Sequence, residues 1–348
     1  MTARTMHRYL RLEGDELTFA DRPQPFLRLL GVRHGLLVLL HEVEEWTDVV
    51  VGPEGGGTTR TLARIDPEGC QIAAAAGDDF VVIARKDALG LKDGLRIVPI
   101  RDGEARLDGS VHYLCEPLYA GALLVGSAGG VAMHALVDDE WSIAAFGARG
   151  LERYTAAEPQ TILDLAIDEH AVAFVRADAD GVELVRIDRT DGHEDRAVVE
   201  RPRALGLEQG VPYVVDGERV VAFRAGSLEE IARVPEDLAL QSPLVVNGGK
   251  DEVFVGLPEM RARCGDDDEF LGAGVARIGR DGVAVVHSNG PTGDWDSAEG
   301  IRSMLGQFAA GNVPPVTLEV RGEWLMLGGG AARLRCDAPP VPRLSLIP

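Results

Sequence analysis

Residues 184–188 read Leu-Val-Arg-Ile-Asp, and a glycine follows at position 192. Close copies of this phrase occupy residues 62–66 and 275–279, and a weaker copy, Ile-Val-Pro-Ile-Arg, begins at residue 97. Each copy is a short apolar run before an Asp or Gly turn, which is typical of a β-strand leading into a hairpin. The starts at 62, 97, 184 and 275 are 35, 87 and 91 residues apart. These gaps fit one or two repeats of a unit of about 44 residues.

A repeat of this length built from short strands is typical of a β-propeller blade. Strand-like runs follow one another along the chain, separated by turn signals at about the 8–12-residue spacing of all-β proteins. Seven groups of such runs cover residues 26–66, 70–106, 111–146, 161–199, 204–234, 244–287 and 316–335. The sequence therefore predicts an all-β fold, a β-propeller of seven blades with four antiparallel strands each. Residues 1–348 would form a single domain.

Two segments stand outside the seven groups. Residues 1–20 alternate apolar and polar side chains around a Gly14-Asp15 turn, and we expect this hairpin to complete the last blade, since closure removes open strand edges. Residues 296–312 instead place Ile301, Met304, Leu305 and Phe308 at helical spacing, which predicts a short helix at 297–310 inserted between the last two blades. The apolar side chains of this helix either pack against the propeller or remain exposed to bind a partner.

Charge and composition exclude several classes of partner. The 348 residues carry a net charge of −21, with 56 acidic against 35 Lys and Arg side chains. Such a surface repels nucleic acid and anionic membranes. No apolar run is long enough for a membrane span, and residues 1–19 do not read as a signal peptide. The four cysteines are scattered along the chain without metal-binding spacing: Cys70, Cys115, Cys264 and Cys336. We therefore expect free thiols and a cytoplasmic location.

The regular spacing of the predicted strands and hairpins resembles that of the bacterial seven-bladed β-propeller superfamily, with a WD-repeat-like architecture. Only three lysines occur against many arginines, a bias typical of a GC-rich bacterial genome. The WD signature does not recur at blade spacing, because Trp295-Asp296 lies in an irregular stretch and Gly192-His193 stands alone. Glycine pairs follow apolar runs, as in kelch repeats, at 129–130, 248–249 and 328–329, but their usual aromatic partners do not recur. The resemblance therefore implies a fold and transfers no functional residues.

No motif for catalysis, metal binding or cofactor binding is evident. There is no nucleophile elbow, and the eight histidines are scattered, although side chains could converge at the mouth of a central channel. Asp266-Asp267-Asp268-Glu269 lacks the alternating ligands of a calcium loop, and Asp178-Ala179-Asp180-Gly181 reads as a hairpin turn. The sequence predicts no metal and no cofactor.

The sequence favours a non-catalytic scaffold or adaptor that binds another protein through rim loops, expected at residues 52–59, 258–271 and 287–297. An Arg-rich or otherwise basic partner would suit the acidic surface. The predicted contact residues are Asp266, Asp267, Asp268, Glu269 and Trp295. The alternative is a hydrolase or lyase with its site at the channel mouth. A sugar-binding module is disfavoured because only 5% of residues are aromatic. The oligomeric state is left open.

Overall fold

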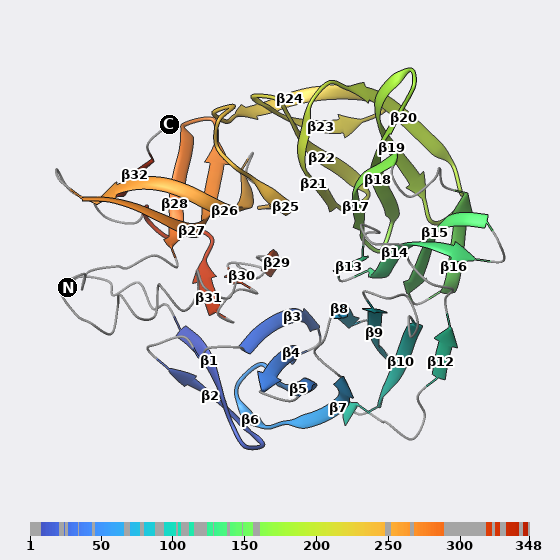
Figure 1. The fold of residues 1–348 in the computed structure, drawn as a ribbon, viewed down its shortest axis with the longest axis vertical. Helices are drawn as coiled ribbons and strands as arrows, with labels where there is room; N and C mark the ends of the chain where they lie inside the picture. The colour runs from blue at the N-terminus through green and yellow to red at the C-terminus, as the bar shows by residue number, and fades with distance from the viewer. Residues whose placement is uncertain are drawn as a thin grey trace.

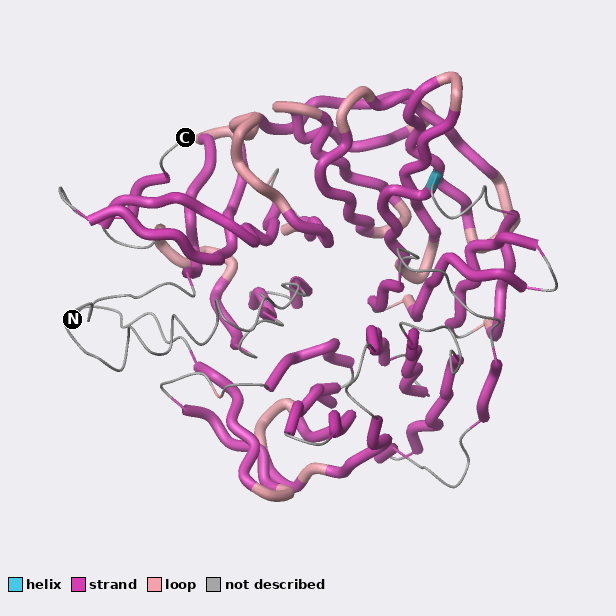
Figure 2. Tube along the Cα trace, in the orientation of Figure 1, coloured by secondary structure: helices cyan, strands magenta, loops and turns pink. Residues whose placement is uncertain are grey.

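A computed structural model covers the chain, and its strands form seven antiparallel sheets among the residues it describes. Those residues are 8–20, 24, 27–33, 35–43, 46–65, 70–76, 80–87, 94–101, 104–105, 111–114, 124–127, 129–137, 140–147, 149–155, 161–247, 252–264, 268–288, 318–321, 324–327, 332–340 and 344–346. Figure 2 shows that strand is the dominant structure of this part of the chain. No helix in it is long and apolar enough to cross a membrane.

The first three sheets come from the first half of the chain. Sheet 1 contains β3 (Leu27–Arg33), β4 (Leu36–Val43), β5 (Trp46–Pro53) and β7 (Arg60–Ile65). Sheet 2 contains β8 (Cys70–Ala76), β9 (Phe80–Asp87), β10 (Gly94–Arg101), β11 (Glu104–Ala105) and β12 (Val111–Leu114). Sheet 3 contains β13 (Leu124–Ser127), β14 (Gly130–Val137), β15 (Glu140–Gly147) and β16 (Gly150–Thr155).

Three further sheets follow in chain order. Sheet 4 contains β17 (Ile162–Ile167), β18 (Ala171–Asp178), β19 (Gly181–Asp188) and β20 (Glu194–Val199). Sheet 5 contains β21 (Pro202–Glu208), β22 (Val211–Asp216), β23 (Arg219–Arg224) and β24 (Ser227–Arg233). Sheet 6 contains β25 (Gln241–Val246), β26 (Val253–Cys264), β27 (Asp268–Gly279), β28 (Gly282–Ser288) and β32 (Leu344–Leu346).

Sheet 7 joins the two ends of the chain. It combines β29 (Leu318–Arg321), β30 (Trp324–Leu327) and β31 (Ala332–Arg335) with β1 (Arg8–Glu13), β2 (Glu16–Ala20) and β6 (Gly57–Thr58). Tyr9 on β1 lies opposite Ala332 on β31. The first strand therefore extends the sheet that the last part of the chain begins.

The seven sheets stand around a common centre (Figure 1), which makes the fold a β-propeller. The innermost strands are β3, β8, β13, β17, β21, β25 and β29, and each begins its sheet. The expectation of an all-β propeller is thus confirmed. The predicted helix at 297–310 lies outside the described residues.

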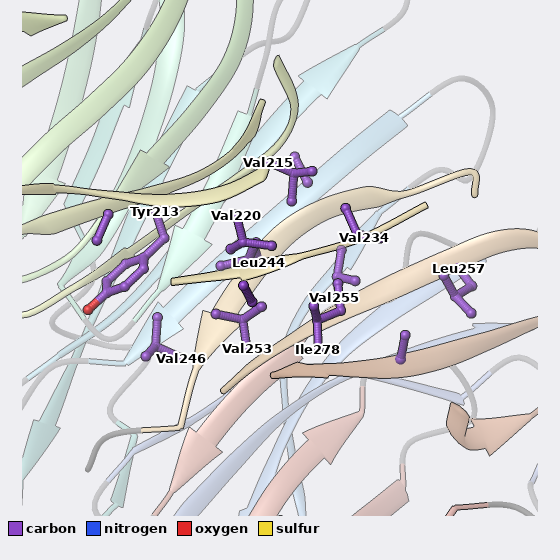
Figure 3. Packing of buried hydrophobic residues seen from close by; sticks show 14 of the residues in the cluster. Tyr213, Val215, Val220, Val234, Leu244, Val246, Val253, Val255, Leu257 and Ile278 are labelled. Atoms are coloured by element: carbon purple, nitrogen blue, oxygen red, sulfur yellow. The ribbon is translucent and has the colours of Figure 1, made fainter. Parts of the chain in front are cut away.

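Neighbouring sheets bury their apolar faces against each other. Between sheets 5 and 6, Val220 on β23 and Val253 on β26 are fully buried in one cluster with Val255 and Ile278 (Figure 3). Alternation along each strand sends every second side chain into such an interface. Because both faces of these sheets are covered, β-branched and leucine side chains dominate the strands, as the sequence pattern indicates.

The repeated phrase marks equivalent places in the ring. Its copies at 97, 184 and 275 lie on β10, β19 and β27, each the third strand of its sheet and two sheets from the next. The gaps of 87 and 91 residues are therefore two blades each. The copy at 62 lies on β7, the fourth strand of sheet 1, which explains why the first gap of 35 residues is shorter than one repeat.

Three predicted boundaries were wrong. Val111–Leu114, expected to open the third group, pairs with β10 in sheet 2. Residues 57–58, expected in a rim loop, form β6 and pair with β2. The expected rim loop at 258–271 is instead largely strand, because β26 and β27 continue as a long hairpin to Cys264 and Asp268. Apolar alternation locates strands but does not say which neighbour each one pairs with.

Candidate functional site

The inner strands of sheets 4, 5 and 6 meet around one carboxylate, that of Asp164 on β17. Its Oδ2 accepts a hydrogen bond from the Ser242 hydroxyl on β25, and its Oδ1 accepts one from the N–H of Leu165 at 2.9 Å. The Ser242 oxygen in turn accepts the N–H of Leu205 on β21, also at 2.9 Å. A single carboxylate and a single hydroxyl thereby connect three successive inner strands.

Close backbone packing makes this connection possible. A Cβ placed on Gly206 of β21 would lie 1.8 Å from the carbonyl oxygen of Leu244 on β25. Only glycine allows the two strands to approach so closely. Each of the three strands also has a register irregularity near its start, at Ile162/Asp164, Pro202/Ala204 and Gln241/Val245. Such irregularities change the direction in which the side chains at the start of each strand point.

Burial of Asp164 raises its pKa to about 6, although the hydrogen bonds from Ser242, Leu165 and Leu205 favour the charged form. Desolvation dominates because no cation forms an ion pair with Asp164 in the described chain. The sequence contains the signal: Ile162-Leu163-Asp164-Leu165-Ala166-Ile167 is an apolar strand with one acidic residue in it. Neither Asp164 nor Ser242 is among the contact residues predicted from the sequence.

A second polar cluster lies between sheets 3 and 4, around the buried Arg189. Its guanidinium donates to both carboxylate oxygens of Glu152, at 2.8 and 3.0 Å, and to the carbonyls of Gly129 and Asp168. Tyr154 adds a 2.6 Å hydrogen bond to Glu152. Since these contacts all join groups of the protein itself, the cluster acts as a clamp between two sheets.

Burial and hydrogen bonding in this clamp shift the pKa values of Glu152 and Tyr154. Burial alone would raise the pKa of Glu152, but the hydrogen bonds from Arg189 and Tyr154 hold it below its ordinary value. Burial and the bond to Glu152 raise the pKa of Tyr154. At neutral pH the cluster is therefore an ion pair with a neutral phenol.

The arginine of the repeated phrase has a similar role. Arg186 on β19 donates to the Gly210 carbonyl of the next sheet at 2.6 Å and pairs with Asp188 and Asp195. Arg277 on β27 lies 3.4 Å from the carbonyl of Cys336, just beyond β31. In these two copies the arginine thus joins consecutive sheets, whereas Arg64 in the copy at 62 pairs with Asp48 of its own sheet.

The predicted contact residues are only partly within the described chain. Asp268 and Glu269 begin β27, opposite Cys264 and Arg263 of β26. Asp266, Asp267 and Trp295 lie outside the described residues. The structure therefore places half of the acidic run at the tip of a hairpin and does not bring it together with Asp164. Among the described residues, no group of three or more His, Cys, Asp or Glu side chains is arranged to hold a metal ion.

Comparisons with known proteins concern the fold. No family model and no curated protein sequence matches the chain. A chain in the crystal structure of the mitotic checkpoint complex is similar over 91% of this chain and 92% of its own, with 10% identity and a TM-score of 0.50. The dihydro-heme d1 dehydrogenase NirN in complex with DHE matches over 97% of this chain and 74% of its own, with 10% identity and a TM-score of 0.46.

A quinonprotein alcohol dehydrogenase-like protein from Bacteroides thetaiotaomicron also matches, over 82% of this chain and 75% of its own, with 11% identity and a TM-score of 0.45. At such low identity the similarity extends to the fold alone. One fold supports many unrelated functions, so a function for this chain has to be argued from its own residues.

Proposed function

We propose that this β-propeller is a non-catalytic scaffold that binds a protein partner with a basic surface through the tip of the β26–β27 hairpin. The observation that carries the proposal is the length of these two strands. Each spans 12 residues, whereas β28 pairs with β27 only over Gly274–Gly279. The hairpin therefore continues beyond the body of its sheet (Figure 1).

The edges of this tip differ in how they are paired. On one side, β32 pairs with Ala262–Cys264 of β26. On the other side, β26 is the one strand among the described residues that pairs with residues 268–273 of β27, since β28 pairs only with Gly274–Gly279. An open strand edge offers backbone N–H and C=O groups to an added strand. Sheet 6 has already accepted one short strand at this tip, so strand addition is compatible with its geometry.

Charge at the tip selects the partner. Asp266, Asp267, Asp268 and Glu269 are consecutive in the sequence, and the last two of them begin β27. An extended segment rich in Arg or Lys would pair its backbone with β27 and its charges with this run. The overall charge of −21 would speed the encounter with a basic partner. Trp295 remains a predicted additional contact.

The test compares three forms of the full chain for binding of an arginine-rich peptide and for proteins recovered from native cells. The quadruple variant Asp266→Asn/Asp267→Asn/Asp268→Asn/Glu269→Gln should weaken peptide binding roughly tenfold or more at low salt, since each exposed pair contributes about 0.2–1 kcal/mol. Its matched control, Asp178→Asn/Asp180→Asn, removes charges from the exposed β18–β19 turn and should bind like the native chain. Equal binding by all three forms would contradict the proposal.

The alternative, a hydrolase or lyase at the channel mouth, has one observation in its favour. A carboxyl with a raised pKa, such as Asp164, is a feature of many catalytic sites. However, the Ser242 hydroxyl donates to Asp164 and accepts from Leu205, so each of these groups already has its partner within the protein. The arrangement fits a structural link better than a general acid and a nucleophile, which favours the scaffold.

A further inference from the structure

We propose that two copies of this chain associate through the outer edge of β20, so that their two copies of sheet 4 join into one antiparallel sheet about a two-fold axis at Val198. This interface is separate from the proposed partner site on sheet 6. β20 is the last strand of sheet 4 and lies at the rim of the ring (Figure 1). In the part of the chain that the structure describes, β19 is the one strand that pairs with it. The other edge of β20 is therefore a place where a further strand can be added.

The ladder of β20 is regular, unlike that of three other outer strands. β7, β24 and β28, which end sheets 1, 5 and 6, each pair with their neighbour through a register irregularity. Such bulges twist an edge away from pairing with another chain. β20 instead pairs with β19 over six consecutive residue pairs without a shift. Its edge is therefore straight, as strand addition requires.

An apolar side chain is exposed on this strand. Val198 is 72% exposed, the higher of the two values found for exposed large apolar side chains in the described chain. Its neighbours Ala197 and Val199 instead pack into the interface between sheets 4 and 5. Pairing with a second β20 would place Val198 beside its counterpart on one face of the joined sheet and cover part of its surface.

The hydrogen-bond pattern decides which backbone groups face the open edge. The N–H of Asp188 donates to the carbonyl of His193 at 2.9 Å, so these residues form a hydrogen-bonded pair at the hairpin end of the ladder. Such pairs alternate with pairs that share no hydrogen bond. Arg196 and Val198, the latter opposite Glu183, fall at positions of the second kind. Their N–H and C=O groups therefore point away from β19.

Charge decides the register between two antiparallel copies. Groups that face the edge must meet their like, so the two-fold axis passes through a residue and not between two. An axis at Arg196 would bring two arginines together, and an axis at Ala197 would place Glu194 opposite Glu200. An axis at Val198 places Arg196 opposite Glu200 of the second copy, and symmetry repeats this contact. Val198 is therefore the centre that the charges favour.

Both members of this contact are in reach of a second copy. The side chain of Arg196 is 50% exposed, and Glu200 is exposed. Arg196 holds Glu194 of its own strand through Nε. Because a guanidinium has five N–H donors, it can hold a second carboxylate at the same time.

The paired segment is short. β20 ends at Val199, since the N–H groups of Glu200 and Arg201 both donate to Oδ1 of Asp216, at 2.9 and 2.7 Å. Backbone hydrogen bonds between the copies are therefore centred on Val198, and the contacts of Glu200 are made by its side chain.

Size and net charge set the strength of this association. One short edge per copy is less than the standard interface of about 1,600 Å². Each copy also carries a charge of −21, which opposes self-association. At physiological ionic strength, charges more than about 8 Å apart are largely screened. We therefore expect a reversible dimer with a dissociation constant on the order of 100 μM in physiological salt.

The test measures self-association of the full chain by analytical ultracentrifugation, from about 10 μM to about 1 mM. Arg196→Glu places two acids opposite each other, and Glu200→Arg places two arginines there, so each variant should raise the dissociation constant about tenfold or more. The double variant Arg196→Glu/Glu200→Arg should associate like the native chain. The matched control Arg233→Glu, on the outer strand of sheet 5, should also do so.

An equimolar mixture of the two single variants separates this interface from an effect of net charge. In a mixed dimer each contact again joins one acid and one arginine, so the mixture should associate where each variant alone does not. Arg196→Glu makes a copy more negative and Glu200→Arg makes it less negative. Net charge alone would therefore move the two variants in opposite directions.

A further variant tests the backbone contact without changing charge. Val198→Pro removes an N–H that faces the edge, where proline is tolerated within a sheet, so it should abolish the dimer while the Tm stays near that of the native chain. A native chain that remains monomeric at about 1 mM would overturn the proposal. So would single variants that dimerise as the native chain does, because the dimer would then use another surface.

Discussion

At the scale of single residues, the propeller is held by polar groups placed where sheets meet. Arg189 has a side chain only 2% exposed, and its partner Glu152 is 15% exposed. Surface pairs such as Arg233 with Glu230 have 68% and 40% exposed side chains. Removing one member of a buried pair leaves its partner unpaired in a poorly solvated place, whereas removing one member of an exposed pair leaves the other in water.

Arg189→Ala should therefore destabilise the protein by about 3–5 kcal/mol at pH 7, as measured by urea unfolding. The loss should shrink at low pH. Because the pKa of Glu152 is lowered in the folded chain, the stabilisation is present above the unfolded pKa and is lost as pH falls through the folded one. The control Arg233→Ala should change stability little, and similar losses in the two variants would show that Arg189 is not a clamp.

At the scale of elements, the ring depends on how closely inner strands approach. Gly206 and Leu244 bring β21 and β25 into direct backbone contact, while Gly55, in the turn before β6, has no atom near the position of a Cβ. Neither glycine has the positive φ that a side chain would strain. The difference between them is steric.

Gly206→Ala should cost about 1–3 kcal/mol or more, since the new methyl group meets a backbone oxygen that cannot rotate away. Thermal unfolding should show a lower Tm for this variant. Gly55→Ala serves as the matched control and should melt like the native chain. A normal Tm for Gly206→Ala would mean that β21 and β25 are further apart than the structure has them.

The strands themselves could be predicted because buried β-strands have a strong local pattern. Ala171–Asp178 and Val211–Asp216 are apolar runs ended by turn residues, and the sequence places them well. The pairing of the strands was harder to predict. Which strand Val111–Leu114 pairs with, and how far the β26–β27 hairpin extends, depend on the strands that the fold brings close to them. The Asp164–Ser242 bond could not be predicted, because only the ring brings together residues 78 positions apart.

At the scale of the whole molecule, the two ends of the chain meet in one sheet of the ring. Sheet 7 takes β29, β30 and β31 from the end of the chain and β1 from its beginning. Non-local pairing of this kind leaves sheet 7 without the edge that β31 would otherwise present. Elsewhere in the ring, the Arg189–Glu152 pair and the Asp164–Ser242 bond join sheets 3 to 6.

The most direct test of the closed ring is a disulfide between β1 and β31. Tyr9 lies opposite Ala332, so Tyr9→Cys/Ala332→Cys should form an intramolecular bond on mild oxidation, identified by peptide mapping. In the control Thr18→Cys/Ala332→Cys, the first cysteine lies on β2, one strand further away, and should remain unlinked. Efficient bonding of the first pair and not the second is the predicted result. Failure of the first pair, or equal bonding of both, would contradict the ring.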